Sequence, residues 1–442
     1  MKIEVVSREF IKPYHSTPPS LRDYNISLID ELSLAMYIPI VLYYSNDNLS
    51  SSSRCDHLKR SLSKVLTRFY PFAGRYIKES FMVDCSDQGA EFVEAIVDVG
   101  LHDFIGQTKN MKMELLNCLF PRPVGAGDEA THPLLAVQVS AFACGGWATV
   151  VLTSHRIADM STSSTFVNEW AINAKQLLEG SDENHDIPIM SPSWTSASLF
   201  PGKKDSGLPL GLSGAKENIE DHKVVTKVFF FNKSSISRIR EMARLDKFSE
   251  TLPTRVQSVF GIIGKAIIDI HVADSGTSKG FLVNQAVNMR ERTDPPIPKN
   301  QCGNLFLVST AHIVAGKRSV EFQSIVDLLT RAVGREVENC KMILSVGGQM
   351  IITNGLNELT KTLAKPEIAC NLVFTDWCKF PFYEADFGLG KPVWASGINS
   401  PLGNIVCLFN DKFGEGIEAW VSLNANDMHK FELDPNIMEF SS

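Results

Sequence analysis

Residues 135–159 read LAVQVSAFACGGWATVVLTSHRIAD, two apolar runs that surround Gly145-Gly146 and end in a histidine and an aspartate four positions apart. The two runs are typical of strands joined by a tight turn. Apolar residues at helical spacing follow at 166–170. A side chain at the end of a strand, beside the start of a helix, is well placed to face a cleft. His155 and Asp159 are therefore the first candidates for chemistry.

The His155-x-x-x-Asp159 pair suits acid–base chemistry. An imidazole, with a reference pKa of about 6.5, accepts a proton from an alcohol at neutral pH when it is held in one tautomer. An aspartate four residues on could hold the loop or the ring. A zinc site needs a third and usually a fourth ligand, and His132, Cys144 and His185 do not have helpful spacing. Because such a pair also arises by chance, the pattern alone makes a catalytic histidine a hypothesis.

The spacing of apolar residues predicts further strands and helices along the rest of the chain. Alternating or continuous apolar runs predict strands, and apolar residues at three- and four-residue steps predict helices. The segments 82–85 and 91–97 flank a Ser-Asp-Gln-Gly sequence, which is typical of a hairpin turn. We expect strands at 2–10, 82–85, 91–97, 135–142, 147–153, 223–231 and 281–288, and helices at 56–70, 234–245 and 254–270.

Between residues 188 and 221, prolines, glycines and serines replace the periodic apolar positions, which indicates a connection between domains. At about 150 residues per domain, a chain of 442 residues has room for two or three. We therefore predict an α/β fold of the α+β kind. Its N-terminal domain is expected at 1–190, an interdomain crossover at 191–222 and a C-terminal domain at 223–442.

The composition is that of a soluble globular protein, because 44% of the residues are apolar and 21% are charged. A net charge of -7 without a basic stripe makes a nucleic-acid partner unexpected. Nine cysteines without a CxxC pair favour reduced thiols in the cytoplasm over a disulfide framework or a zinc ribbon. The N-terminus lacks a signal-peptide core, and the longest apolar runs, at 38–44 and 260–270, are short for a membrane span.

Two glycine-containing segments suggest other chemistry. Residues 276–280, GTSKG, match the G-x-S-x-G nucleophile elbow of serine hydrolases. The elbow requires a strand before the serine and a helix after it, whereas the order expected here is the reverse. Residues 386–392, DFGLGKP, indicate a sharp turn, and their glycine spacing does not fit a Walker motif.

The segments HRIAD at 155–159 and DFGLGKP at 386–392 resemble the HxxxD and DFGWG motifs of the plant BAHD acyltransferases. Both stand at the usual places in a chain of the usual length. The resemblance covers essentially the whole chain and is closest to the alkaloid and alcohol acetyltransferase branch that includes vinorine synthase. Other similar segments lie at 11–13, 28–30, 61–64, 69–75, 83–85, 142–146, 285–290 and 303–304.

The resemblance implies two chloramphenicol-acetyltransferase-like domains with a solvent channel between them. An acyl-CoA is then a co-substrate that enters from one side, a small-molecule alcohol enters from the other, and no cofactor or metal is bound permanently. His155 is the implied general base, which deprotonates the acceptor hydroxyl so that its oxygen attacks the thioester through a tetrahedral intermediate. The implied reaction transfers acetyl from acetyl-CoA to a hydroxyl of a plant specialised metabolite, an alkaloid or a terpenoid.

The resemblance also implies roles for residues outside the histidine motif. Asp159 would point away from the substrates and pair with Arg290. Thr375 and Trp377 would donate hydrogen bonds to the developing oxyanion, for which a hydroxyl and an indole N–H are suitable donors. Asp386 would be distant from the reacting atoms and structural, with a role as a second proton acceptor left open.

Binding residues are assigned by position. The resemblance places acyl-CoA near Gly388 and near a helix start at Thr254, Arg255 and Ser258, where helix N-terminal N–H groups suit anions. Tyr37 and Ile38 are expected to contact the acceptor.

The chain departs from the family at Leu389, which stands where the family usually has Trp. The position packs a turn, so we expect the change to alter the channel wall without abolishing activity.

Alternatives to acetyl transfer remain. The donor could be malonyl-CoA or an aromatic acyl-CoA, and the chain could be a noncatalytic family member that binds small molecules. We further expect a cytoplasmic monomer with neither a nucleic-acid nor a membrane partner.

Overall fold

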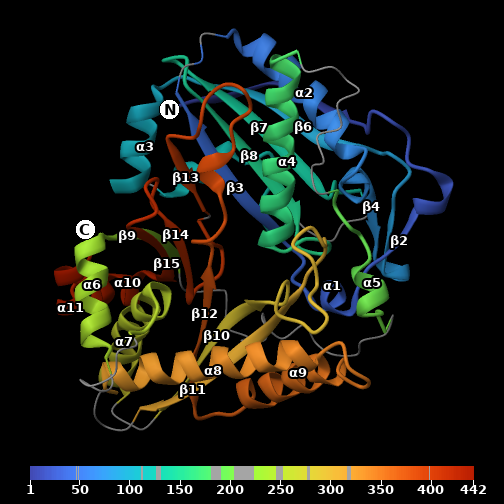
Figure 1. The fold of residues 1–442 in the computed structure, drawn as a ribbon. Helices are drawn as coiled ribbons and strands as arrows, with labels where there is room; N and C mark the ends of the chain where they lie inside the picture. Colours follow the sequence, from blue (N-terminus) through green and yellow to red (C-terminus); the bar gives the residue numbers. More distant parts are fainter. Residues whose placement is uncertain are drawn as a thin grey trace. The chain divides into compact units, whose positions relative to one another are not determined.

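The computed structural model describes the chain apart from residues 46, 48, 111–112, 126–130, 181–190, 204–222, 245–251, 276–278, 316–319 and 398. The chain divides into two compact units (Figure 1). Unit 1 consists of residues 1–207, 298–305 and 380–398, and unit 2 of residues 208–297, 306–379 and 399–442. Each unit combines a six-stranded sheet with helices, so the predicted α/β class is confirmed.

The large sheet of unit 1 has the order β1-β6-β7-β8-β3-β13. Its strands β7 and β8 form the predicted antiparallel pair, joined by a turn in which Gly145 has φ +83°. Helices α2 and α4 lie side by side over one face (Figure 1). The strands are β1 (Ile3–Ile11), β6 (Ala90–Val97), β7 (Leu135–Phe142), β8 (Trp147–Ser154), β3 (Tyr37–Tyr44) and β13 (Trp394–Ser396), and the helices α1 (Leu28–Leu32), α2 (Ser51–Leu66), α3 (Leu101–Asn110), α4 (Met160–Leu178) and α5 (Ser196–Leu199).

A second, three-stranded sheet in unit 1 shows that the predicted hairpin is wrong. It contains β2 (Asp23–Asn25), β5 (Met82–Asp84) and β4 (Arg75–Ile77), whereas β6 pairs with β1 and β7. The turn between β5 and β6 does form, with φ +58° at Asp87 and +96° at Gly89. However, the Asp87 carboxylate accepts hydrogen bonds from the N–H (2.9 Å) and hydroxyl (2.6 Å) of Thr17. The turn therefore leads the chain from one sheet into another.

The sheet of unit 2 has the order β11-β10-β12-β14-β15-β9. Its core helix α7 is long and apolar enough over residues 255–273 to cross a membrane by length and composition alone, yet 67% of that window is buried in the protein. The strands are β11 (Phe306–Ala315), β10 (Lys279–Asn288), β12 (Ile368–Asp376), β14 (Ile405–Asn410), β15 (Ile417–Asn424) and β9 (Val224–Phe231), and the helices α6 (Lys233–Met242), α7 (Arg255–Ser275), α8 (Phe322–Met342), α9 (Met350–Leu363), α10 (Ala425–Glu432) and α11 (Pro435–Phe440).

The units are not continuous in sequence. Two segments of the predicted C-terminal domain, 298–305 and 380–398, belong to unit 1. The second contributes β13, in which Trp394 lies opposite Tyr43 of β3. Residues 204–222 of the predicted crossover lie outside the described residues.

Candidate active site

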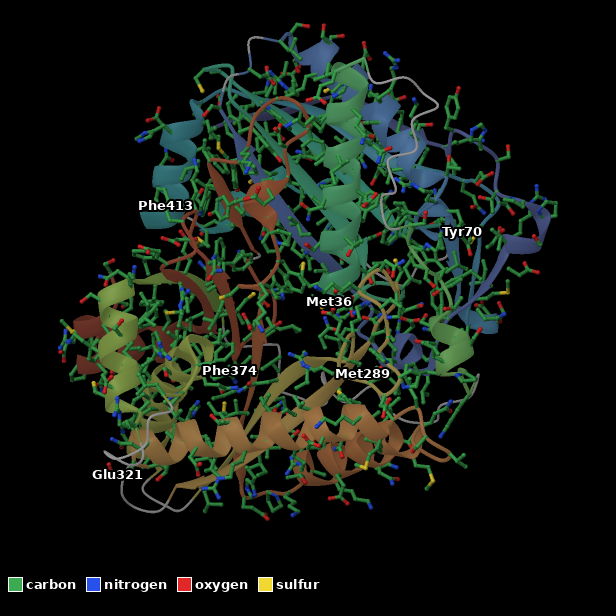
Figure 2. The ribbon with its side chains drawn as sticks, in the orientation of Figure 1. Met36, Tyr70, Met289, Glu321, Phe374 and Phe413 are labelled. Carbon is green, nitrogen blue, oxygen red and sulfur yellow. The ribbon has the colours of Figure 1, made fainter. Side chains whose placement is uncertain are left out.

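His155 follows the last residue of β8 and leads into α4. Its backbone N–H donates to the carbonyl of Met36 (2.8 Å), the residue before β3 that is labelled in Figure 2. Burial lowers the pKa of the imidazole below its ordinary value and outweighs the opposite effects of Asp159, of the ring's hydrogen bond with the backbone of His155 and of Asn304. The ring is therefore neutral at pH 7 and able to accept a proton.

Asp159 is the N-cap of α4. One carboxylate oxygen accepts from the N–H of Thr162 (2.9 Å), and the other accepts from the N–H of Leu305 (3.1 Å). The carboxylate thus starts the helix and ties it to the segment 298–305. Arg290 belongs to unit 2, where its N–H donates to the side chain of Asn288 (3.0 Å). The pairing of Asp159 with Arg290 stays a prediction.

A hydrogen-bonded cluster around Asn304 contains residues that were not predicted as site residues. Asn304 Nδ2 donates to the backbone carbonyl of His155 (2.7 Å) and to Asp30 Oδ1 (2.8 Å). The Asn304 N–H donates to the same Asp30 oxygen (2.8 Å), and the N–H and hydroxyl of Ser27 donate to the other (2.9 and 2.8 Å). The fully buried Asp30 has its pKa raised to about 6 by burial. The cluster fixes the backbone position of His155.

A glycine permits this arrangement. Gly303 has φ +110°, and a Cβ there would lie 2.6 Å from Ser196 Oγ. The carbonyl of Gly303 accepts from the Thr162 hydroxyl (3.0 Å) in the first turn of α4. The Gly-Asn pair at 303–304, which also belongs to the segments that resemble the family, was the sequence signal that could have identified this cluster.

Thr375 lies near the end of β12 in unit 2, directly after Phe374, which is labelled in Figure 2. Trp377 follows the last residue of that strand. The Trp377 indole N–H donates to the hydroxyl oxygen of Thr375 (3.0 Å). Because the threonine oxygen accepts this bond, its own O–H remains able to donate. The indole thus donates to the hydroxyl, which differs from the expected arrangement of two parallel donors, and the oxyanion role of both residues stays a prediction.

The segment 386–390 forms the predicted sharp turn. Asp386 accepts hydrogen bonds from the N–H groups of Gly388 (2.9 Å) and Gly390 (3.0 Å) and from Lys175 Nζ (2.9 Å). The ring of Phe387 is fully buried and packs edge-on against Trp170. These contacts support a structural role for Asp386, with the half-buried Leu389 inside the turn.

The start of α7 contains the residues expected to contact acyl-CoA in unit 2. Thr254 Oγ1 accepts from the Gln257 N–H (3.1 Å). The Arg255 guanidinium donates to the carbonyls of residues 414–416, at 2.8–3.2 Å, and so holds the turn before β15. Among the described residues, the buried polar atoms Gln257 Oε1, Ser258 Oγ and Gln285 Nε2 have no hydrogen-bond partner. They are therefore suited to binding a polar ligand group.

Tyr37 and Ile38 are buried on β3, opposite Ser154 and Thr153 of β8. The Tyr37 hydroxyl donates to the carbonyl of Pro133 (2.6 Å). Their contact with the acceptor stays a prediction, as does that of Gly388 with acyl-CoA.

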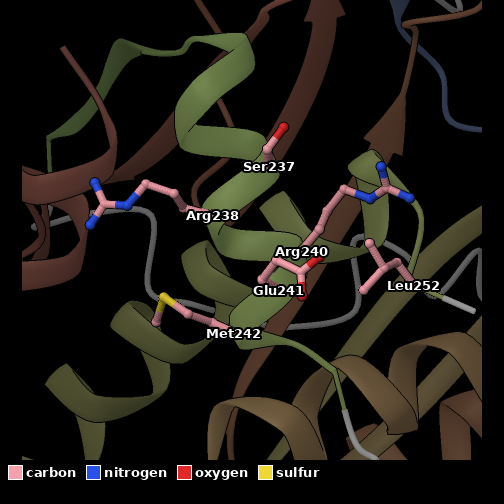
Figure 3. A pocket seen from close by; sticks show the side chains of 6 residues that line it. All are labelled: Ser237, Arg238, Arg240, Glu241, Met242 and Leu252. Atoms are coloured by element: carbon pink, nitrogen blue, oxygen red, sulfur yellow. The ribbon is translucent and has the colours of Figure 1, made fainter. Parts of the chain in front are cut away.

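A surface hollow of about 530 Å³ in unit 2 is lined by residues of α6 and by Leu252, which lies two positions before Thr254 (Figure 3). Both arginines of its lining bind groups outside the hollow: Arg238 pairs with Glu439, and Arg240 donates to the Pro253 carbonyl (2.8 Å). The hollow is lined by Ser237, Arg238, Arg240, Glu241, Met242 and Leu252.

In the described part of the chain, no three His, Cys, Asp or Glu side chains gather as they would around a metal ion.

Known proteins resemble this chain over its whole length. A model described as "Transferase family" matches residues 1–438. A pelargonidin-derivative 4'''-malonyltransferase from Salvia splendens is 36% identical, with 100% of both chains covered. Salutaridinol 7-O-acetyltransferase from Papaver somniferum is 34% identical over 98% of this chain and 96% of its own. The crystal structure of vinorine synthase superposes with a TM-score of 0.82 at 31% identity, covering 100% of this chain and 99% of its own.

Proposed function

The chain belongs to the transferase family of BAHD acyl-CoA-dependent acyltransferases, and from this premise we propose that it transfers an acetyl group from acetyl-CoA to a hydroxyl group of a plant alkaloid or terpenoid. The observation that carries the proposal is the state of His155. Its imidazole is neutral because burial lowers its pKa, and its backbone is fixed by Met36 and Asn304. A neutral, held imidazole is what proton abstraction from an alcohol requires.

In the proposed mechanism, His155 takes the proton of the acceptor hydroxyl while the oxygen attacks the thioester carbonyl. The C–O bond forms and the carbonyl oxygen becomes negative in the tetrahedral intermediate. The Thr375 hydroxyl, supported by Trp377, donates a hydrogen bond to that oxygen. The intermediate expels the coenzyme A thiolate, which takes the proton from the imidazolium. Asp159 and Asp386 organise their helix and turn.

The acyl donor is the less constrained part of the proposal. The acetyltransferase and the malonyltransferase among the relatives have similar identities, 34% and 36%. Buried Gln257, Ser258 and Gln285 offer hydrogen bonds to uncharged groups such as the pantetheine amides, which all acyl-CoA donors share. A malonyl group would in addition need a cationic partner for its carboxylate.

A donor panel tests the proposal. The purified chain is incubated with acetyl-CoA, malonyl-CoA or an aromatic acyl-CoA and a set of alkaloid, terpenoid and anthocyanin alcohols. Free thiol is measured with a thiol reagent, and the ester product by mass spectrometry. We expect the highest kcat/KM with acetyl-CoA. A preference for malonyl-CoA would replace the donor in the proposal, and no ester with any donor would favour a noncatalytic binding protein.

The cytoplasmic location, the monomeric state and the solvent channel stay predictions. Membership of the family supports acyl transfer from an acyl-CoA to a small molecule.

A further inference from the structure

The orientation of the Asn304 side chain is fixed by its hydrogen bonds. Nδ2 lies 2.7 Å from the His155 carbonyl oxygen and 2.8 Å from Asp30 Oδ1. Both of these oxygens are acceptors at neutral pH, so the amide end that faces them is the NH₂ group. The side-chain amide of Asn304 therefore has one orientation, in which Nδ2 faces these two oxygens and Oδ1 faces away from them.

Asn304 Oδ1 is buried and, among the described residues, makes no hydrogen bond that satisfies strict geometry. A buried acceptor of this kind destabilises the folded protein unless a donor is close. The nearby donor is the His155 imidazole, whose Nδ1 is also buried and whose ring interacts with the Asn304 side chain. This interaction raises the pKa of the imidazole, which is the direction expected when an oxygen accepts from a ring N–H.

We propose that Asn304 Oδ1 accepts the proton of His155 Nδ1 and thereby holds the imidazole in the tautomer whose Nε2 is unprotonated. Asp30 supports this arrangement, because its carboxylate binds both the N–H and the side-chain NH₂ of Asn304. Asn304 is then the positioning residue of the base, and Asp30 holds Asn304. The inference rests on the proposed function, since it assigns the nitrogen that would take the acceptor's proton.

The tautomer decides whether the base can work. When Nδ1 carries the proton, Nε2 has a free lone pair for the acceptor O–H, and Asn304 Oδ1 supports the imidazolium that forms. Three other groups act on the ring: Asp159 and a hydrogen bond with the backbone of His155 itself raise its pKa, and Arg156 lowers it. The Arg156 guanidinium donates to the carbonyls of Glu31 (3.1 Å) and Ser33 (2.5 Å), which keeps it beside α1.

Nitrogen-15 NMR of the histidine-labelled wild-type protein tests the tautomer without requiring activity. The His155 signals are identified by their loss in His155→Gln. At pH 8 we expect a protonated, pyrrole-type Nδ1 and an unprotonated, pyridine-type Nε2. The opposite tautomer, or an equal mixture of the two, would overturn the proposal. Because no substrate is needed, this result is separate from success or failure of the donor panel.

Asn304→Ala then tests the positioning role in an active protein. We expect kcat to fall by on the order of 10²-fold with KM for acyl-CoA little changed, because tautomer control is lost while CoA binding is not. The His155 signals should become those of a tautomer mixture. Asp30→Asn, which keeps the side-chain shape, should show a smaller fall and the same spectral trend. Wild-type signals in folded Asn304→Ala would contradict the inference.

Discussion

His155 stays neutral because burial outweighs the attraction of Asp159 for the imidazolium. The two oxygens of Asp159 accept from the N–H groups of Thr162 and Leu305, so its charge is used to start α4 and to hold the segment 298–305. The spacing of the motif therefore reflects helix capping, because His155 directly follows the strand β8 and Asp159 is the N-cap of the helix α4.

The first prediction at this scale concerns pH. A general base must be neutral, and the lowered pKa of His155 means that it becomes protonated only below about 6.5, the ordinary value. The acid limb of kcat/KM should accordingly have its midpoint below pH 6.5, with no loss attributable to His155 between pH 7 and 8. Steady-state rates from pH 5 to 9 check this, and an acid midpoint above 7 would contradict the assignment.

The second prediction ranks Thr375 and Trp377. The indole of Trp377 donates to the threonine oxygen. We therefore propose that the Thr375 hydroxyl, and not the indole N–H, donates the hydrogen bond to the oxyanion. Thr375→Val should reduce kcat by about 10²–10³-fold, the usual effect of losing an oxyanion donor. Trp377→Phe, which keeps an aromatic ring but removes the N–H, should reduce it by about 10-fold. Equal losses, or a larger loss for Trp377→Phe, would favour two parallel donors.

At the scale of elements, the 386–390 turn is held by backbone geometry. Gly388 and Gly390 both have positive φ, +83° and +96°, and both N–H groups donate to Asp386. Their surroundings differ. A Cβ on Gly388 would lie 2.8 Å from Leu178 Cδ1 and 3.1 Å from Lys175 Cα, whereas a Cβ on Gly390 would meet nothing within 4 Å. The turn therefore packs against α4 through Gly388.

The two glycines provide a matched pair of variants. Gly390→Ala adds backbone strain alone and should destabilise the protein by about 1–2 kcal/mol. Gly388→Ala adds steric overlap with α4 and should cost about 2–4 kcal/mol. Thermal unfolding of both variants measures the difference as a larger fall in Tm for Gly388→Ala. Equal falls in Tm, or a larger fall for Gly390→Ala, would contradict the packing of the turn against α4 through Gly388.

Elements that depend on local signals could be predicted from the sequence. The β7–β8 pair follows from two apolar runs around Gly145, and its predicted bounds are close to those observed. Helix α2 begins at Ser51, five residues before the predicted start, because Ser50 accepts from the Ser53 N–H (3.1 Å). The predicted β5–β6 hairpin does not form because β5 pairs with β2 and β4, whereas β6 pairs with β1 and β7. Distant strand partners of this kind leave no local signal.

At the scale of the whole molecule, the fold combines distant parts of the chain within one unit. Asp30 and Asn304 are 274 positions apart and share two hydrogen bonds. Periodicity could place the strands and the histidine, and the family resemblance could place the motifs. Neither could show that residues 303–305 return to His155 and Asp159, because that contact depends on the paths of both halves of the chain. For the same reason, the predicted domains were continuous whereas the units are not.

The central claim is that His155 is the base of an acyl transfer. Coenzyme A release and ester formation from acetyl-CoA, compared between wild type, His155→Ala and His102→Ala, test it most directly. His102 is an exposed histidine on α3 and serves as the matched control. We predict that His155→Ala lowers kcat/KM by about 10²–10⁴-fold, the usual contribution of a general base, while His102→Ala keeps the wild-type value. A folded His155→Ala with wild-type kcat/KM would contradict the account.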